Sequence, residues 1–219
     1  MDSRTFTAGL VAEMQDLFAR LGERETLEAE SQGKVEVVSL LKLALASELE
    51  ASELAAYWLP MTPEIDAKFA FAAQVGDEMR HYQLISRRLT ELGVDLEGFD
   101  PVADGRSALY HYMQSLGTTV ERIAAGPFAS EAIAEVRNRQ FIAFCESVGD
   151  HETARLYREI IQPEEVHHHH LGREILEKYA VTPELQELVA AATRNTLAIA
   201  DELSALAAKT TGLQAIPVS

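Results

Sequence analysis

The sequence predicts an all-α protein: a four-helix bundle with additional N-terminal, linking and C-terminal helices. Hydrophobic residues make up 47% of the 219 residues, which is enough for one large core. Glycine (12 residues) and proline (7 residues) are scarce, and this composition favours helix. Apolar residues recur every three or four positions in all long segments, whereas strand-like alternation never lasts more than a few residues.

Glycine, proline and capping residues divide the chain into helices and turns. A first helix, about 5–21, and a polar connector form an N-terminal segment, 1–33. A last helix, about 183–209, belongs to a C-terminal segment, 181–219. The bundle between them, 34–180, is expected to hold helices at about 35–59, 63–92, 128–148 and 151–179, with a linking helix at about 106–123 that is broken at Gly126–Pro127. Short turns join the four long helices into two antiparallel hairpins.

Composition also limits the compartment and the partners of the protein. The single cysteine, Cys145, excludes an internal disulfide, and the N-terminus lacks the pattern of a signal peptide, so we expect a cytoplasmic protein. No run approaches the roughly 18 apolar residues that a membrane span requires. A formal net charge of −16 repels phosphate backbones and anionic lipids. We therefore expect neither a nucleic-acid partner nor a membrane partner.

A glutamate interrupts the apolar stripe of the helix at 35–59. Leu41, Leu45 and Ala55 recur at helical spacing, and Glu48 lies in the middle of their stripe, whereas Glu50 lies well off it. Burying a carboxylate costs free energy unless it is paired or bound to a metal ion. Glu48 is therefore a candidate ligand.

The helix at 63–92 carries a similar interruption. Glu78 lies within the stripe formed by Phe71 and Ile85, and His81 follows one turn later at the edge of the same face. Glu-x-x-His spacing places a carboxylate beside an imidazole, as two ligands of one ion require.

The helix at 151–179 offers two overlapping versions of this motif, Glu164-x-x-His167 and Glu165-x-x-His168. Laying Glu164 over Glu78 keeps one apolar face, because Tyr157, Ile161, Leu171 and Ile175 then fall on Phe71, Val75, Ile85 and Leu89. Laying Glu165 over Glu78 places Arg158, Gln162, Gly172 and Leu176 there instead. Glu164 and His167 are therefore the predicted ligands.

The neighbouring histidines are expected to play lesser roles in this register. His168 takes the place of Tyr82, facing inward behind the ligands, while His169 and His170 point sideways or into solvent. Pro163 either restarts the helix or marks a bulge, because an interior proline costs about 3 kcal/mol and such breaks often lie beside functional sites.

The helix at 128–148 must supply the fourth carboxylate, and its sequence leaves two candidates. Glu131 lies nearer the centre of the apolar stripe. Glu135, one turn later on the same face, better matches the spacing of the first hairpin. The stripe slightly favours Glu131, and Glu135 remains the alternative.

Together these residues form the pattern Glu … Glu-x-x-His … Glu … Glu-x-x-His, with one element on each helix of the bundle. This is the carboxylate-bridged two-metal arrangement of ferritin-like proteins. Four carboxylates neutralise two divalent ions, and one imidazole per ion leaves positions open for dioxygen or water.

The chain resembles ferritin-like di-iron carboxylate proteins over about residues 35–180. SELEASELA (47–55), GDEMRHYQLISRRLTELG (76–93) and GDHETARLYREIIQPEEVHHHH (149–170) are similar to an uncharacterised bacterial family of that superfamily. LYREIIQPEEVHH also resembles a helix of the di-iron tRNA hydroxylase. More distantly, the chain is similar to subunits of the phenylacetyl-CoA ring epoxidase.

The resemblance implies a ligand set. The pattern of the uncharacterised family would make Glu48, Glu78, His81, Glu164 and His167 ligands. Its proline-to-glutamate spacing, at GPFASE in this chain, favours Glu131, whereas the tRNA-hydroxylase pattern favours Glu135.

A ligand set of this kind implies an expected function. We expect an oxidoreductase in which two iron ions, or manganese or a mixed iron–manganese pair, activate dioxygen to oxidise a small organic substrate. The alternatives are a ferroxidase or other iron-handling protein, and a non-catalytic metal-binding helical bundle. We also expect a homodimer.

Overall fold

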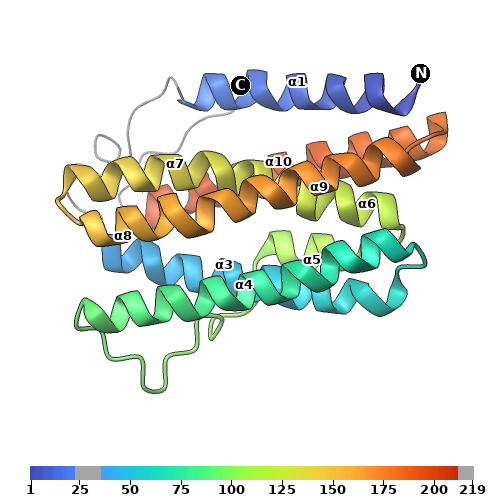
Figure 1. Cartoon of the computed structure of the whole chain (residues 1–219). Coiled ribbons are helices and arrows are strands. Elements are labelled where there is room, and N and C mark those ends of the chain that lie inside the picture. Colours follow the sequence, from blue (N-terminus) through green and yellow to red (C-terminus); the bar gives the residue numbers. More distant parts are fainter. Residues whose placement is uncertain (23–35, 212–219) are drawn as a thin grey trace.

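The structure is a computed structural model that describes residues 1–22 and 36–211, and every element that these residues form is helical (Figure 1). This confirms the predicted all-α class. The predicted polar connector and the end of the C-terminal tail lie outside the described residues. No described helix combines the length and the apolar character that crossing a membrane would require.

The predicted long helices are present, with small shifts at their ends. The linking helix is in fact two short helices, separated at Ser115–Thr118 because Thr118 caps a new helix with a capping box. The elements in chain order are α1 (Ser3–Gly22), α3 (Val37–Trp58), the 3₁₀ turn η1 (Leu59–Met61), α4 (Ile65–Glu91), α5 (Ala108–Gln114), α6 (Thr119–Ile123), the π-helix η2 (Ala124–Ser130), α7 (Glu131–Ser147), α8 (His151–Leu156), the π-helix η3 (Tyr157–Ile161), α9 (Gln162–Tyr179) and α10 (Pro183–Thr211).

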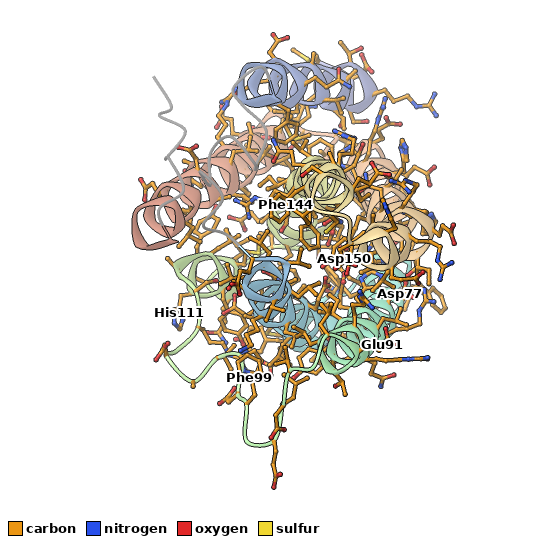
Figure 2. All side chains as sticks on the ribbon, turned by 90° about the vertical axis from the view of Figure 1, so that its left-hand side faces the viewer. Asp77, Glu91, Phe99, His111, Phe144 and Asp150 are labelled. Atoms are coloured by element: carbon orange, nitrogen blue, oxygen red, sulfur yellow. The ribbon has the colours of Figure 1, made fainter. Side chains whose placement is uncertain are left out.

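Two antiparallel hairpins pack against each other, as the turns predict. One is α3–α4, and the other is η2–α7 followed by α8–η3–α9 (Figure 1). Asp150 caps the start of α8 by accepting a hydrogen bond from the Thr153 amide. Helix α1 lies along the outside of the second hairpin, against α9 and α10. Viewed along the bundle, the helices surround a closely filled interior (Figure 2).

Two apolar clusters fill this interior. One surrounds Trp58, Phe71 and Phe128, and the other surrounds Leu45 and Ile85 near the opposite end of the bundle. The buried residues of α4 change along its length from Phe71 through Gln74, Glu78 and His81 to Ile85 and Leu89. A polar layer therefore lies between the two apolar clusters.

The π-helix η3 accommodates Pro163. A proline lacks the amide hydrogen and its ring collides with the carbonyl of the residue four positions earlier, but a π turn is one residue wider and relieves both problems. Pro163 consequently lies in the first turn of α9 without ending the helix. Of the two predicted alternatives, the bulge is confirmed and the restart is not.

The π-helix η2 plays the same part around Pro127. The predicted break at Gly126–Pro127 is wrong, because α6, η2 and α7 follow one another without a gap. Trp58 packs closely on Gly126, where an added Cβ would lie 2.9 Å from the indole ring. Glu131 begins α7 directly after this π turn, so the turn sets the direction of that side chain.

Gly172 allows α9 to approach η2. A Cβ at this position would lie 2.8 Å from the carbonyl carbon of Pro127 and 2.9 Å from the Phe128 nitrogen. Both are backbone atoms, so they cannot move aside as the end of a side chain can. The contact requires glycine.

Replacing Gly172 with alanine should lower the free energy of unfolding by about 1–3 kcal/mol, because the added methyl group forces the two backbones apart. Thermal unfolding should show a Tm lower by roughly 2–10 °C. Gly9→Ala is the matched control, since no atom lies within 4 Å of a Cβ built there. Equal Tm values for the two variants would contradict the close approach.

Candidate metal centre

The polar layer contains four glutamates and two histidines from four helices. None of these residues is more than 8% exposed. They are Glu48 on α3, Glu78 and His81 on α4, Glu131 on α7, and Glu165 and His168 on α9. They come together because each replaces an apolar residue in the inward stripe of its helix, at the same level of the bundle.

The six residues form two overlapping groups, each with the composition of a metal site. Glu48, Glu78, His81 and Glu165 form one group; Glu78, Glu131, Glu165 and His168 form the other. Within each group the potential ligand atoms lie within 4.8 Å of one another. Glu78 and Glu165 belong to both groups, so each of these carboxylates would be available to both of two bound ions.

Both histidines turn Nδ1 towards the shared carboxylates. His81 Nδ1 lies 3.1 Å from Glu78 Oε2 and 3.5 Å from Glu165 Oε1. His168 Nδ1 lies 3.4 Å from Glu78 Oε1 and 3.6 Å from Glu165 Oε2. The two halves of the layer are thus related by an approximate two-fold symmetry.

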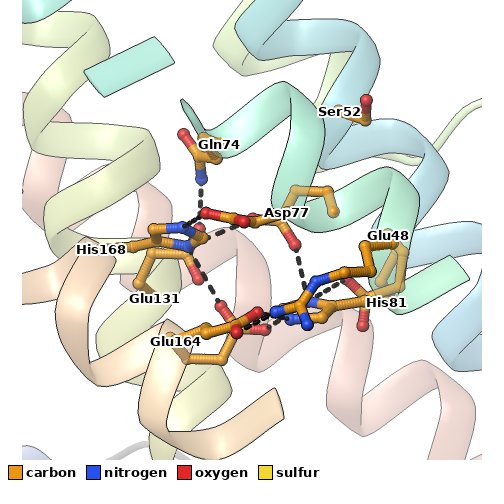
Figure 3. Close-up of polar contacts among 12 residues, drawn as sticks. Glu48, Ser52, Gln74, Asp77, His81, Glu131, Glu164 and His168 are labelled. Carbon is orange, nitrogen blue, oxygen red and sulfur yellow. Dashed lines mark hydrogen bonds and ion pairs between the residues drawn. The ribbon is translucent and has the colours of Figure 1, made fainter. Parts of the chain in front are cut away.

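The outer nitrogen of each ring is held by the acidic residue that precedes a shared glutamate on the opposite helix. His81 Nε2 donates to Glu164 Oε2 at 2.8 Å, and His168 Nε2 donates to Asp77 Oδ2 at 3.1 Å (Figure 3). Arg80 in turn pairs with Glu164. Such acceptors fix the ring orientation and leave Nδ1 to face an ion.

The predicted register of α9 is wrong by one residue. The structure brings Glu165 and His168 into the layer, not Glu164 and His167. Glu164 lies at its edge with 28% of its side chain exposed, and His167 faces outward. Glu164 is close enough to orient His81, but it belongs to neither group of candidate ligands.

The π turn explains this error. Overlaying the motif on α4 assumed a continuous α-helix, but η3 adds about one residue to its turn and rotates the later part of the helix by about 100°. At the start of the turn, Tyr157 faces inward and Arg158 does not. After the turn, the inward-facing positions of the other register are filled by Glu165, Gly172 and Leu176. In the sequence, Gly172 argues against the register of Glu165 because it is not a large apolar residue. In the structure, its missing side chain is what allows α9 to approach the backbone of η2.

The remaining histidines differ partly from expectation. His170 is exposed, as predicted. His169, expected on the solvated side, is half-buried: its ring stacks on Phe128, and its Nδ1 lies 2.7 Å from the Phe128 carbonyl oxygen. His168, expected behind the ligands, lies in the layer and belongs to one of the two candidate groups.

On α7 the structure separates the two candidates. Glu131 lies in the layer at 5% exposure. Glu135 faces away from it, pairs with Arg139 one turn later on the outer surface, and belongs to neither group. The alternative ligand Glu135 is therefore incorrect, because α7 turns that side chain out of the layer.

Several inward-facing atoms of the layer have unused bonding capacity. Glu78 Oε1, Glu165 Oε2 and His168 Nδ1 are buried and form no hydrogen bond with any residue in the described part of the chain. Buried polar atoms without partners are rare in folded proteins because each costs free energy. All three residues belong to the group that contains His168, whose Nδ1 lies 3.4 Å from Glu78 Oε1 and 3.6 Å from Glu165 Oε2. The donor set, four carboxylates and two imidazoles, fits a pair of divalent transition-metal ions.

Crowding of the carboxylates raises the pKa values of Glu48, Glu131, His81 and His168. Burial raises the pKa of Glu48 and of Glu131 well above the usual range, and the charges of Glu78 and Glu165 add to this. Burial alone would lower the pKa of a histidine, but neighbouring carboxylates outweigh it: they raise the pKa of His81 to about 11 and that of His168 to about 10. Without metal the layer therefore holds protons at neutral pH.

Metal binding at pH 7 should release protons, because an imidazole must be neutral to bind an ion. His81 and His168 supply one proton each, and the carboxyls of Glu48 and Glu131 add to these, so we expect about two to four protons per chain. Titration of the metal-free protein with Mn²⁺ in weakly buffered solution measures the release. His167→Ala should release the same number. Release should fall as the pH rises through about 10 and then about 11, where first His168 and then His81 loses its proton without metal; a pH-independent value would contradict the prediction.

The two halves of the layer differ in the residue that contacts the carboxylate belonging to one group only, Glu131 in one half and Glu48 in the other. Gln74 is 3% exposed, and its Nε2 donates to Glu131 Oε1 at 2.5 Å (Figure 3). The equivalent carboxylate in the other half, Glu48, has His81 beside it. Ser52, one turn from Glu48, bonds instead to the Val75 carbonyl oxygen. Gln74 thus fixes the orientation of Glu131, and Ser52 has no such effect on Glu48.

Replacing Gln74 with leucine should weaken binding of one of two metal ions, because Glu131 loses its fixed orientation. We expect a roughly tenfold higher dissociation constant for the affected step, the usual size of such effects. Mn²⁺ binding followed by electron paramagnetic resonance resolves the two steps. Ser52→Ala should leave both steps unchanged, and equal effects of the two variants would contradict the role of Gln74.

Sequence reasoning missed Asp77 and Gln74. A signal for Asp77 is present: both motifs have the pattern acid–Glu-x-x-His, Asp77-Glu78 in one and Glu164-Glu165 in the other. Recognising this repeat would also have selected Glu165, since each shared glutamate is the second acid of its pair. Gln74 carries no comparable signal, because a single buried glutamine follows no pattern.

Comparison of the chain with known proteins finds no relative. Neither protein-family models, nor curated proteins, nor solved structures match the chain. The interpretation of this layer consequently depends on its residues and their geometry.

Proposed function

We propose that this protein is a ferritin-like di-metal carboxylate oxidoreductase that binds two iron ions and activates dioxygen to oxidise an organic substrate. One observation carries the proposal: Glu78 and Glu165 each belong to two ligand groups, and each group has one histidine of its own. A single-ion site or a structural ion-pair network does not require this duplication.

The charges of the layer support a pair of divalent ions. Four carboxylates carry four negative charges when ionised, which two divalent cations neutralise in a buried environment. Oxygen-rich donors with one imidazole per ion suit iron and manganese, whereas thiolate-preferring metals find no sulfur ligand among these residues. Cys145 is buried in the neighbouring apolar cluster instead.

The protein residues prepare the site for redox chemistry. When bound, ferrous ions would supply electrons to dioxygen. Glu164 and Asp77 hold the rings of His81 and His168 in place, so the two nitrogen donors need little reorientation. The apolar clusters on either side exclude water and so strengthen the electrostatic interactions within the layer.

Anaerobic loading with Fe²⁺ followed by exposure to oxygen tests the proposal. We expect about two iron ions per chain and a change in the visible absorption spectrum when oxygen is admitted. Oxygen consumption that increases with an added organic reductant or substrate supports oxidoreductase function. Consumption that depends only on the amount of Fe²⁺ supports iron handling instead, and one ion or none per chain rejects the di-metal proposal.

A further inference from the structure

The two acidic residues that hold the outer histidine nitrogens differ in their own partners. Glu164, which accepts from His81 Nε2, also pairs with Arg80. Asp77, which accepts from His168 Nε2, pairs with no lysine or arginine in the described part of the chain (Figure 3). One of these two carboxylate charges is therefore neutralised by a neighbouring cation, and the other is not.

Each candidate group defines one ion position, which we name after its histidine. The His81 position consists of Glu48, Glu78, His81 and Glu165, and the His168 position consists of Glu78, Glu131, Glu165 and His168. Because the shared glutamates belong to both positions, only the remaining neighbours can make the two positions differ.

These remaining neighbours give the two positions different charges. Beside the His81 position lie Glu48, Glu164 and Arg80, which together carry one negative charge when both carboxyls are ionised. Beside the His168 position lie Glu131 and Asp77, which together carry two. A cation in a poorly solvated site is attracted more strongly where more negative charge surrounds it. The charges thus favour the His168 position.

Gln74 adds to this difference in the same direction. It donates to Glu131 Oε1 and holds that carboxylate in place. Glu48 has no such amide donor among the described residues, and its Oε2 lies 3.5 Å from His81 Nδ1, an atom that would itself bind the ion. A ligand that is already oriented loses less freedom when it binds.

We infer that the two ion positions are unequal: the His168 position takes up the first ion, and the His81 position takes up the second ion more weakly. Asp77 and Arg80 are positioning residues for this order, because they act through the histidines and Glu164 without being ligands. The inference rests on the proposed di-metal function. It divides the metal pair into a resident ion and an ion that exchanges more readily.

Titration of the metal-free full-length protein with Mn²⁺, followed by electron paramagnetic resonance, tests this order. At one Mn²⁺ per chain the parent protein should hold mostly single ions, and spin-coupled pairs should form as the second ion is added. Asp77→Asn should raise the dissociation constant of the first step roughly tenfold. The asparagine oxygen can still accept from His168 Nε2, so this variant removes the charge and keeps the ring orientation.

Arg80→Gln should change the other step and in the opposite direction. Removing this cation leaves the Glu164 charge without its partner, so the second Mn²⁺ should bind roughly threefold more tightly, a small effect because Arg80 is 46% exposed. Spin-coupled pairs should then form at lower Mn²⁺ concentrations than in the parent protein.

Matched controls remove the same charges away from the layer. Arg87→Gln lies two turns after Arg80 on α4, and Asp104→Asn lies in the exposed loop before α5. Both variants should leave the two binding steps unchanged. His81→Ala should keep the first ion, and His168→Ala should not.

Three results would overturn the inference. They are two steps of equal affinity in the parent protein, effects of Asp77→Asn and Arg80→Gln on the same step, and loss of the first ion from His81→Ala. Binding of fewer than two ions per chain would reject the di-metal proposal itself, and this inference with it.

Discussion

Replacing Glu165 with glutamine should remove both metal ions from the protein, because this carboxylate belongs to both ligand groups. Glutamine has nearly the same shape, so the bundle keeps its packing, but it lacks the negative charge that a bridging ligand provides. Metal analysis of protein purified without chelators should fall from about two ions per chain to less than one. Glu135→Gln, on the outer face of α7, should leave the metal content unchanged.

Variants of the two adjacent histidines His167 and His168 test the register of α9 directly. His168→Ala should lose metal, whereas His167→Ala, its exposed neighbour, should not. Their sequence positions differ by one residue, so composition and expression effects are closely matched. Loss of metal from the Glu164 and His167 variants, with normal content in the Glu165 and His168 variants, would show that α9 has the register predicted by a continuous α-helix.

Removing the metal ions should strongly lower the thermal stability of the protein. Without cations, the buried layer avoids an excess of negative charge only by holding protons, because burial and the neighbouring carboxylates raise the pKa of Glu48 and Glu131. An ion present at a hundred times its dissociation constant adds about 2.7 kcal/mol, so two ions add about 5 kcal/mol. For a chain of this length, that corresponds to a Tm higher by roughly 10–20 °C.

Calorimetry of one preparation, before and after chelation and after adding Mn²⁺ back, measures this difference. The Glu165→Gln variant serves as the control, because chelation should not change the Tm of a protein that holds no metal. Equal Tm values for metal-free and metal-loaded parent protein would mean that the layer is stable without cations.

Helical periodicity was sufficient to find most of the candidate site. Glu48, Glu78 and Glu131 interrupt apolar stripes, and an uninterrupted α-helix relates sequence position directly to direction. Where α3 and α4 are regular, the predicted residues Glu48, Glu78 and His81 face the layer.

Periodicity failed where the helix departs from 3.6 residues per turn. The sequence allows a bulge near Pro163, but an overlay that assumes a continuous α-helix omits the rotation that the bulge adds and so favours Glu164. At Gly126–Pro127 the same residue types predicted a break, whereas a π turn carries the helix through. Local sequence does not distinguish these outcomes, because neighbouring helices decide whether a wide turn is packed well enough to persist.

The sequence by itself therefore determined the helical class, the two hairpins and the kinds of ligand that meet between them. Only the tertiary structure decided which of two adjacent Glu-x-x-His motifs faces inward. The physical reason is the π turn η3, which rotates the later part of the helix, together with the contact between Gly172 and the backbone of η2. This contact holds α9 in the rotation that turns Glu165 and His168 into the layer and leaves Glu164 at its edge, beside His81.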